Sequence, residues 1–193
     1  MRIIAGTARG RRLSSPRTGT FDIRPTSDRA REAVFNILAG LVAGARVLDL
    51  FAGTGALGLE ALSRGAKSAL FVDSGQSAIS LIRANIQLCG FSAQTLVVKR
   101  DLSRSLFFLQ PLAPAGGFSL VFVDPPYKTR LAEKIIAQLA EGEMIRAGGT
   151  LVVESSSGDK LPESVSVFSL ADQRVYGEAG FWFYEKMRET CRE

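Results

Sequence analysis

Residues 46–65 read RVLDLFAGTGALGLEALSRG, and they combine a short apolar run, a glycine-rich turn and a helical pattern. An apolar run that ends at Leu50 and is bounded by turn residues is typical of a strand buried on both faces. Gly53 and Gly55 follow, and glycines allow positive φ angles and a close approach to a ligand. A helix that begins directly after them brings free backbone N–H groups to the carboxyl edge of the strand. The pattern therefore predicts a ligand-binding loop, with Gly58 where the helix packs on the sheet.

Two acids indicate which ligand this loop binds. Asp49 lies inside the strand end, where it would repel a pyrophosphate but suit a cationic amino group. Asp73 ends the next apolar run, 68–73, and is placed to bind a ribose diol. Dinucleotide-binding loops use similar glycines, but the two acids favour S-adenosylmethionine over a dinucleotide. A turn that binds no ligand is the alternative.

Composition limits the possible classes of protein. A chain of 193 residues that is 46% hydrophobic is expected to form one globular domain. We expect no membrane span, because no apolar run approaches ~18 residues, and no secretory signal. Two cysteines, Cys89 and Cys191, are too few for a disulfide framework, so a cytoplasmic location is expected. The absence of histidine excludes Ser-His-Asp and Cys-His catalysis and histidine metal sites.

Positive charge is concentrated near the N-terminus. Residues 1–31 hold eight arginines against two aspartates, a net charge of +6, whereas the other residues hold sixteen basic and seventeen acidic groups, a net charge of −1. Arginine without lysine suits bidentate phosphate contacts, so this segment predicts RNA docking, with a solvated tail as the alternative. We expect its contacts to be independent of the glycine loop. The candidate RNA-binding residues are Arg9, Arg11, Arg12 and Arg24.

Apolar strands and amphipathic helices alternate along the chain. We expect strands near 46–50, 68–73, 94–98, 118–123 and 149–154, and helices near 55–64, 75–89 and 128–141, with a shorter one around 102–110. This alternation predicts right-handed βαβ units and a mostly parallel sheet covered by helices on both faces.

The segments at the two ends follow other patterns. Ser27 or Asp28 is expected to cap a helix whose apolar face contains Ala30, Val34, Ile37, Leu38 and Leu41. Residues 2–6 and 11–14 predict a small N-terminal β-hairpin. Segments 165–176 and 180–187 predict a C-terminal antiparallel hairpin.

A second constellation, Asp124-Pro125-Pro126-Tyr127, follows the fourth predicted strand. Ligands bind at the carboxyl ends of such strands, so we expect it to face the same crevice as the glycine loop. Asp124 and the Pro125 carbonyl can accept hydrogen bonds from an exocyclic amino group, and Tyr127 offers a face on which a base can stack. The prolines stiffen the backbone so that both acceptors stay aimed. A proline-rich turn without function is the alternative.

Such a tetrapeptide can activate a nitrogen nucleophile. The lone pair of an exocyclic amine is delocalised into its base, and two acceptors that hold both N–H groups favour a pyramidal nitrogen. That lone pair can attack a sulfonium methyl group in line, so positioning and electrostatics suffice and no metal is needed.

The chain resembles the bacterial 16S ribosomal RNA guanine-N2 methyltransferases, which modify guanine 966 of the small subunit. The resemblance rests on IIAGTARGRRL, RPTSDRAREAVFNIL, VLDLFAGTGALGLEALSRGA, LVFVDPPY and RVYGEAGFWFYEK. It implies a Rossmann-like class I methyltransferase fold with a seven-stranded sheet, formed by residues 26–193 and extended by residues 1–25. It also implies 16S ribosomal RNA in the small subunit as substrate and a monomer that needs no metal.

The resemblance further implies the site residues. S-adenosylmethionine, which leaves as S-adenosylhomocysteine, is expected to contact Asp49, Phe51, Gly53, Thr54, Gly55, Asp73, Ser74, Asp101 and Leu102. Asp101 has an equally good alternative as an exposed helix cap. The catalytic residues are expected to be Asp124, Pro125, Pro126 and Tyr127.

Two other functions fit part of the pattern. A DNA adenine-N6 or cytosine-N4 methyltransferase uses the same tetrapeptide, but it normally carries a separate target-recognition region. No stretch of this chain is large enough to supply one. A non-catalytic RNA-binding module could retain the same fold, although the intact loop and tetrapeptide disfavour that reading.

Overall fold

The computed structural model describes residues 1–15, 27–126 and 131–188. The chain divides into two compact units, Met1–Asp101 and Leu102–Glu193. The first contains the glycine loop and the basic N-terminal segment, and the second contains the Asp-Pro-Pro sequence. Among the described residues, no helix is long and apolar enough to cross a membrane.

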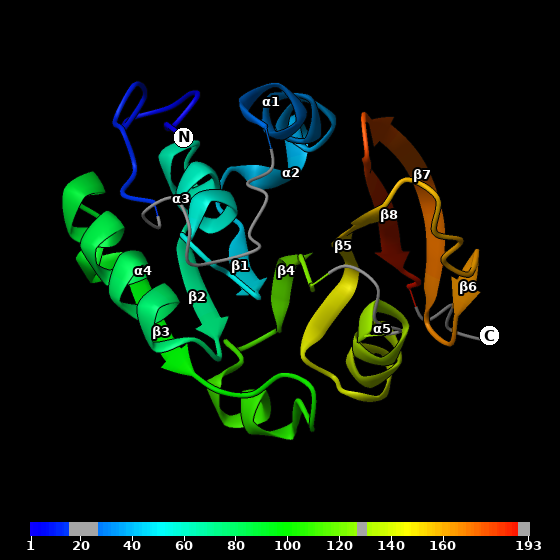
Figure 1. Cartoon of the computed structure of the whole chain (residues 1–193). Helices are drawn as coiled ribbons and strands as arrows, with labels where there is room; N and C mark the ends of the chain where they lie inside the picture. The colour runs from blue at the N-terminus through cyan, green and yellow to red at the C-terminus, as the bar shows by residue number, and fades with distance from the viewer. Residues whose placement is uncertain (16–26, 127–130, 189–193) are drawn as a thin grey trace. The chain divides into compact units, whose positions relative to one another are not determined.

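The first unit is a parallel α/β layer (Figure 1). Its strands lie in the order β3-β2-β1, and each neighbouring pair is parallel. Helix α3 packs on β1 and β2, and α4 packs on β2 and β3. The elements are α1 (Asp28–Ile37), α2 (Ala39–Val42), β1 (Arg46–Leu50), α3 (Ala56–Ser63), β2 (Ser68–Asp73), α4 (Gln76–Cys89), the 3₁₀ turn η1 (Ser92–Gln94) and β3 (Thr95–Lys99).

Helix α1 begins where its capping residue predicts. The Ser27 side chain accepts a hydrogen bond from the Ala30 amide at 3.1 Å, which satisfies one of the donors that a helix N-terminus leaves free. The predicted apolar face is partly wrong, because Ile37 and Leu41 are 39% and 44% exposed. Leu41 lies in the separate short helix α2, so it does not continue the face of α1.

The second unit combines one parallel pair of strands with antiparallel strands. Strand β4 pairs in parallel with β5, and β8 then pairs antiparallel with β5 and with β7, which confirms the predicted C-terminal hairpin. Helix α5 packs against β5 (Figure 1). The elements are η2 (Phe107–Leu112), β4 (Phe118–Val123), α5 (Leu131–Glu141), β5 (Ile145–Ser156), β6 (Ser164–Val165), β7 (Phe168–Tyr176) and β8 (Ala179–Lys186).

Three details of this unit differ from the sequence prediction. The described ranges of the whole chain contain eight strands instead of seven, because the two-residue β6 pairs with β7. Strand β5 begins at Ile145, earlier than expected. The helix expected around 102–110 is replaced by the 3₁₀ helix η2, which contains Pro111. The Leu106 amide donates instead to the side chain of Gln138 on α5 at 2.9 Å.

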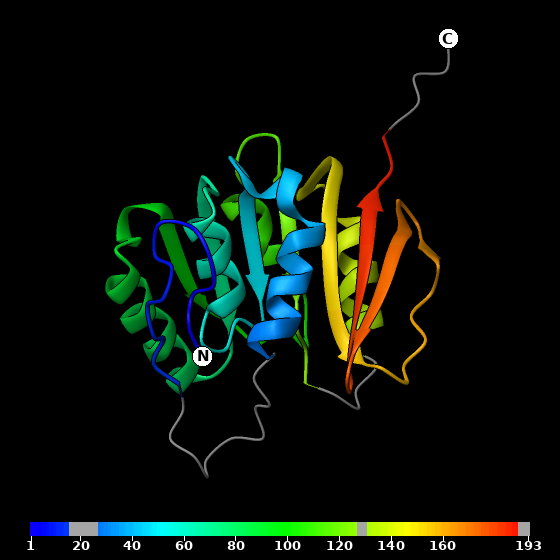
Figure 2. The same cartoon turned by 90° about the horizontal axis from the view of Figure 1, so that it is seen from above.

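Residues 1–15, called the arm below, form the predicted N-terminal hairpin. Arg2 and Arg12 form an antiparallel bridge. The Ile3 amide donates to the Arg11 carbonyl at 3.0 Å, and the Gly10 amide donates to the Ile3 carbonyl at 2.9 Å. The arm lies along α3 and α4 (Figures 1 and 2), and three of its apolar side chains, Ile3, Ala8 and Leu13, are buried.

The arm is fixed to α3 mainly through its backbone. The amides of Ile4 and Ala5 donate to the fully buried carboxylate of Glu60 at 2.7 and 3.0 Å. The Ala8 amide donates to Ser63 Oγ at 2.9 Å. Gly6 has a φ of +80°, and a Cβ there would lie 1.7 Å from the Ser63 carbonyl oxygen, so only glycine fits.

Glu60→Ala should destabilise the first unit and release the arm. The carboxylate also accepts from Arg64 Nε at 2.7 Å and lies 4.0 Å from Nε of the buried Arg31. Removing one partner of a buried ion pair leaves the other charge uncompensated, so the free energy of unfolding should fall by about 3–5 kcal/mol. Urea unfolding measures this loss, and trypsin should cut the arm's arginines faster.

Glu32→Ala is the matched control, because Glu32 is an exposed acid on α1. Its free energy of unfolding should change by no more than about 0.5 kcal/mol. A Glu60→Ala protein that is as stable and as resistant to trypsin as this control would show that the arm is held by other contacts.

Candidate functional site

The loop between β1 and α3 has the backbone conformation that its glycines predict. Gly53 and Gly55 have φ angles of 56° and 77°, both in the left-handed region. Phe51 also has a positive φ, 59°, which is uncommon for a residue with a bulky side chain. Such strained residues cluster at functional sites, where the surrounding structure holds them.

The Asp73 carboxylate holds this loop against the end of β2. Its Oδ2 accepts from the Gly53 amide at 2.9 Å, and its Oδ1 accepts from the Gly75 amide at 2.8 Å. The side chain is half-buried. Each carboxylate oxygen can accept a further hydrogen bond, so Asp73 can hold the loop and still bind a ligand hydroxyl.

Asp49 is buried beneath the same loop. Its Oδ2 accepts from the Gly58 amide in the first turn of α3 at 2.9 Å, which ties the helix to the end of β1. Burial raises the pKa of Asp49 to about 8, the hydrogen bond from Gly58 opposes that shift, and the nearby charge of Asp73 adds to it. Burial therefore favours the protonated form of the Asp49 carboxyl.

Gly58 brings α3 close to the sheet, as predicted. A Cβ at this position would lie 2.4 Å from Cε1 of Phe71 on β2 and 3.0 Å from Asp49 Oδ2. Any larger residue would push the helix away from the strand and from the Asp49 carboxylate.

The loop fits a small ligand that carries hydrogen-bonding groups. Within the described ranges, a Cβ at Gly53 would meet only the Phe51 carbonyl oxygen, at 3.9 Å, so these residues leave space beside this glycine. Gly55 is the N-cap residue of α3, so the free N–H groups of a helix N-terminus follow it. Among the described residues, no group of three histidine, cysteine or acidic side chains could hold a metal ion.

Thr54 and Ser74 have different environments. Ser74 is exposed just after β2, whereas Thr54 is buried and faces the arm. Thr54 Oγ1 lies 3.4 Å from the Met1 sulfur, and the Thr54 carbonyl accepts from Asn85 Nδ2 at 2.9 Å. The expectation that the arm and the loop make independent contacts is therefore wrong.

The other predicted site residues lie near the junction of the units and in the second unit. Asp101 is exposed and ends the first unit, and Leu102 is buried and begins the second. Asp124, Pro125 and Pro126 follow β4 directly and belong to no helix or strand. Asp124 is half-buried and Pro125 is buried. Tyr127 lies outside the described residues.

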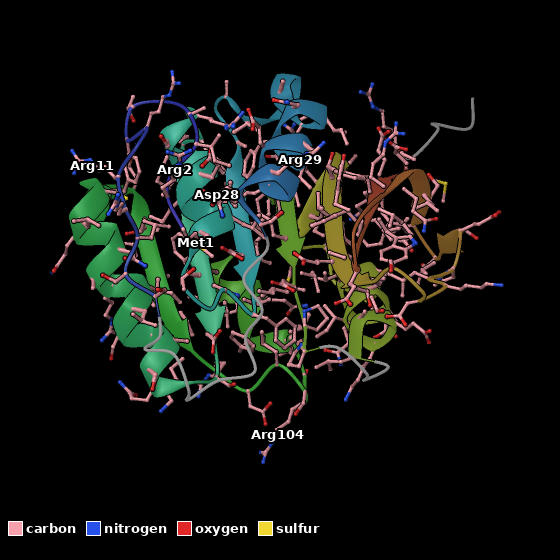
Figure 3. The ribbon with its side chains drawn as sticks, turned by 45° about the horizontal axis from the view of Figure 1, so that its top comes forward. Met1, Arg2, Arg11, Asp28, Arg29 and Arg104 are labelled. Atoms are coloured by element: carbon pink, nitrogen blue, oxygen red, sulfur yellow. The ribbon has the colours of Figure 1, made fainter. Side chains whose placement is uncertain are left out.

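The arm presents its arginine side chains to solvent. Arg9 and Arg12 are exposed, and the Arg11 guanidinium donates to the Leu88 carbonyl near the end of α4. Figure 3 shows Arg11 beside α4 and Arg2 beside Asp28, with Arg2 Nε 3.6 Å from Asp28 Oδ2. Arg24 lies outside the described residues.

One buried contact of the loop, the hydrogen bond from Asn85 to the Thr54 carbonyl, was not predicted from the sequence. This buried amide interrupts the apolar face that Ile79, Ile82 and Ile86 form on α4. A lone polar residue on an apolar helix face signals a buried hydrogen bond, although it does not identify the partner.

Comparisons with known proteins agree with this architecture. Residues 1–185 match a protein-family model described as Conserved hypothetical protein 95. The chain is 34% identical over 186 residues to the ribosomal RNA small subunit methyltransferase D of Escherichia coli strain K12, covering 96% of this chain and 90% of that protein. The protein of the same name from Haemophilus influenzae is 34% identical over 187 residues, covering 96% and 93%.

Solved structures confirm the predicted class I methyltransferase fold. The Escherichia coli protein yhhF, described provisionally as a methyltransferase, has a TM-score of 0.80 and 35% identity, covering 97% of this chain and 98% of that one. An RNA methyltransferase from Salinibacter ruber in complex with S-adenosylhomocysteine shares the fold at a TM-score of 0.64 and 14% identity, covering 88% and 97%. The chain resembles the ribosomal RNA small subunit methyltransferase D proteins over nearly its full length. Because residues 1–185 also match the family model, the chain belongs to the family described as Conserved hypothetical protein 95.

Proposed function

We propose that this protein transfers a methyl group from S-adenosylmethionine to the exocyclic N2 amino group of a guanine in 16S ribosomal RNA, at position 966. Its substrate is the small ribosomal subunit or an assembly intermediate of it. Residues 26–193 act as the methyltransferase domain and residues 1–25 as its RNA-docking extension, in a monomer that needs no metal.

The proposal rests on the conformation of the glycine loop that follows β1. In the part of the chain that the structure describes, two glycines with positive φ leave space beside Gly53, and an acid from the next strand holds the Gly53 amide at 2.9 Å. The names of two relatives at 34% identity, both ribosomal RNA small subunit methyltransferases, support the reaction and the class of substrate.

Each part of the loop has a proposed task toward the donor. Asp73 accepts hydrogen bonds from the ribose hydroxyls with the lone pairs that Gly53 and Gly75 leave unused. Asp49 faces the cationic amino group. The backbone of Phe51, Gly53, Thr54 and Gly55 surrounds the donor, while Ser74, Asp101 and Leu102 contact its adenosine part.

The tetrapeptide after β4 activates the guanine. Asp124 and the Pro125 carbonyl accept hydrogen bonds from the two N–H groups of the amine, and the ring of Tyr127 stacks on the base. Bound S-adenosylmethionine supplies a methyl group on a positively charged sulfur. The carbon–sulfur bond breaks, and the sulfur keeps the electron pair as S-adenosylhomocysteine. When the nitrogen–carbon bond has formed, the amine loses one proton to Asp124 or to water.

Two substitutions should separate donor binding from chemistry. Asp73→Ala removes acceptors from the loop and the ribose, so donor affinity should fall by about 1–3 kcal/mol. Asp124→Ala should leave donor affinity nearly unchanged and lower turnover by about 10²-fold or more, because one electrostatic contact to the transition state is lost. Calorimetric titration with S-adenosylhomocysteine and methylation of 16S ribosomal RNA with labelled donor measure the two effects.

Each variant is the control for the other. Equal donor affinity in Asp73→Ala and the parent would remove Asp73 from the donor site. A parent that binds S-adenosylhomocysteine but labels DNA or no nucleic acid would overturn the proposed reaction. Mass spectrometry of the labelled RNA identifies the methylated base.

Donor affinity should rise with pH between about 6 and 7.5. The pKa of Asp49 is about 8 in the unliganded protein, so the carboxyl is protonated in this range. A cationic amino group favours the carboxylate, so binding below that pKa must release a proton, and affinity should rise by up to about tenfold per pH unit. Asp49→Asn has no proton to release, so calorimetry should give nearly the same affinity across the range. A parent as insensitive to pH as Asp49→Asn would place the amino group elsewhere.

RNA affinity should depend on salt through the arm. Each phosphate that an arginine neutralises contributes about −0.7 to −0.9 to the log–log slope of affinity against salt. Replacing Arg9, Arg11 and Arg12 with alanine should flatten that slope by about two to three, and Arg9→Ala with Arg12→Ala by about one and a half. Arg146→Ala with Lys160→Ala removes two exposed positive charges from the second unit and is the matched control. An arm variant with the parent's slope would make the arm a solvated segment.

A further inference from the structure

Asn85 is the buried amide that joins the arm to the donor loop. It lies on α4 with no exposed surface, between apolar residues that pack on the sheet. A buried polar side chain is costly unless its hydrogen bonds are made, so its partners indicate why it is there.

The partners of Asn85 come from both segments. The Ser14 amide donates to Asn85 Oδ1 at 2.7 Å. Asn85 Nδ2 donates to the Ser14 carbonyl at 3.0 Å and to the Thr54 carbonyl at 2.9 Å. The Ser14 amide needs an acceptor, and the carbonyls of Ser14 and Thr54 each need a donor. Asn85 supplies all three hydrogen bonds in a single orientation of its side-chain amide.

We propose that Asn85 is a positioning residue that couples RNA docking on the arm to donor binding in the loop. The inference rests on the proposed function, since it assumes that the arm binds RNA and the loop binds the donor. The arm is attached to the core by its backbone, at Ile4, Ala5, Ala8 and Ser14, so the exposed arginine side chains remain available for phosphate.

Two further contacts reinforce the coupling. Glu60, which holds the arm amides, lies on α3 directly after the glycine loop. Leu88, whose carbonyl accepts from the Arg11 guanidinium, lies one turn after Asn85 on α4. A phosphate held by Arg11 therefore acts on the same helix that holds the Thr54 carbonyl.

The sign of the coupling follows from shared ordering. A ligand that orders the arm also orders Ser14, Asn85 and Thr54, so the second ligand meets a loop that is already fixed. Couplings between two sites typically change affinity by about 5- to 150-fold, and each ligand must change the affinity of the other by the same factor.

Hydrogen exchange of the parent tests the coupling without any substitution. S-adenosylhomocysteine should slow exchange of the loop amides of Gly53 and Gly55. It should also slow the arm amides of Ile4, Ala5 and Ser14 by about fivefold or more. Slowing at the loop with no change in the arm would overturn the inference.

Asn85→Asp tests whether the amide carries the coupling. A carboxylate keeps an acceptor for the Ser14 amide but cannot donate, and a protonated carboxyl has one O–H for two carbonyls. In either state the side chain can no longer bond both the Ser14 and Thr54 carbonyls, so the arm amides should no longer respond to S-adenosylhomocysteine. Gln87→Glu makes the same amide-to-acid change at an exposed position of α4, and it should respond like the parent. An Asn85→Asp protein with the parent's response would overturn the proposal. If Asn85→Asp does not fold, Ser14→Pro removes the arm's amide donor and should give the same loss of response.

A binding cycle gives a readout that a merely structural role would not move. The affinity for small ribosomal subunits that lack the modification is measured with and without saturating S-adenosylhomocysteine. Their ratio should be about five or more in the parent and Gln87→Glu and close to one in Asn85→Asp. A general loss of stability cancels in this ratio.

The outcomes distinguish this inference from the proposed function. A parent that binds no S-adenosylhomocysteine overturns both. A parent that binds it without methylating small ribosomal subunits that lack the modification contradicts the proposed substrate, while the exchange response of the arm still decides the inference. Equal ratios in the parent and Asn85→Asp overturn the role of Asn85 and leave the proposed reaction standing.

Discussion

The Glu60 carboxylate is buried away from water, so protein donors must satisfy it, and this requirement organises the first unit. Two of its donors are the arm amides of Ile4 and Ala5, and a third is the guanidinium of Arg64. Most contacts that hold the arm come from its backbone, and the Arg11 side chain adds a hydrogen bond to the Leu88 carbonyl. A basic N-terminal segment thereby becomes part of the core while its charge stays exposed.

Asp49 and Asp73 both contact the glycine loop, but their different environments give the two carboxyl groups different roles. Asp49 is buried, its pKa is raised to about 8, and it ties Gly58 of α3 to the end of β1. Asp73 is half-buried at the end of β2 and holds the Gly53 amide. A neutral carboxyl beneath the loop reduces repulsion between the two acids, and a cationic ligand would restore its charge.

The donor loop is therefore held from three elements of the same unit: Asp49 from β1, Asp73 from β2 and Asn85 from α4. Methyl transfer from an activated donor depends chiefly on positioning, because a donor and an acceptor that are fixed in line avoid most of the entropic cost of the reaction. A loop held this way would be preorganised for the proposed reaction. Asn85 also bonds Ser14, so the proposed RNA-docking arm and the proposed donor loop share one buried amide.

Local patterns in the sequence determined the elements of this protein and the chemistry of its loop. The positive φ of Gly53 and the cap at Ser27 follow from properties of single residues and their neighbours, so both were predictable. The arm partners of Glu60 and Asn85 were not, because Ile4 lies 56 residues from Glu60 and Ser14 lies 71 residues from Asn85 along the chain. Leu106 lies where a helix was predicted and directly before a 3₁₀ helix, and its amide likewise donates to a side chain, that of Gln138, 32 residues away. Sequence spacing specifies which side chains share a face of a helix, but not which residues lie opposite that face. The packing of the arm on the helices therefore decides which buried polar groups bond to one another.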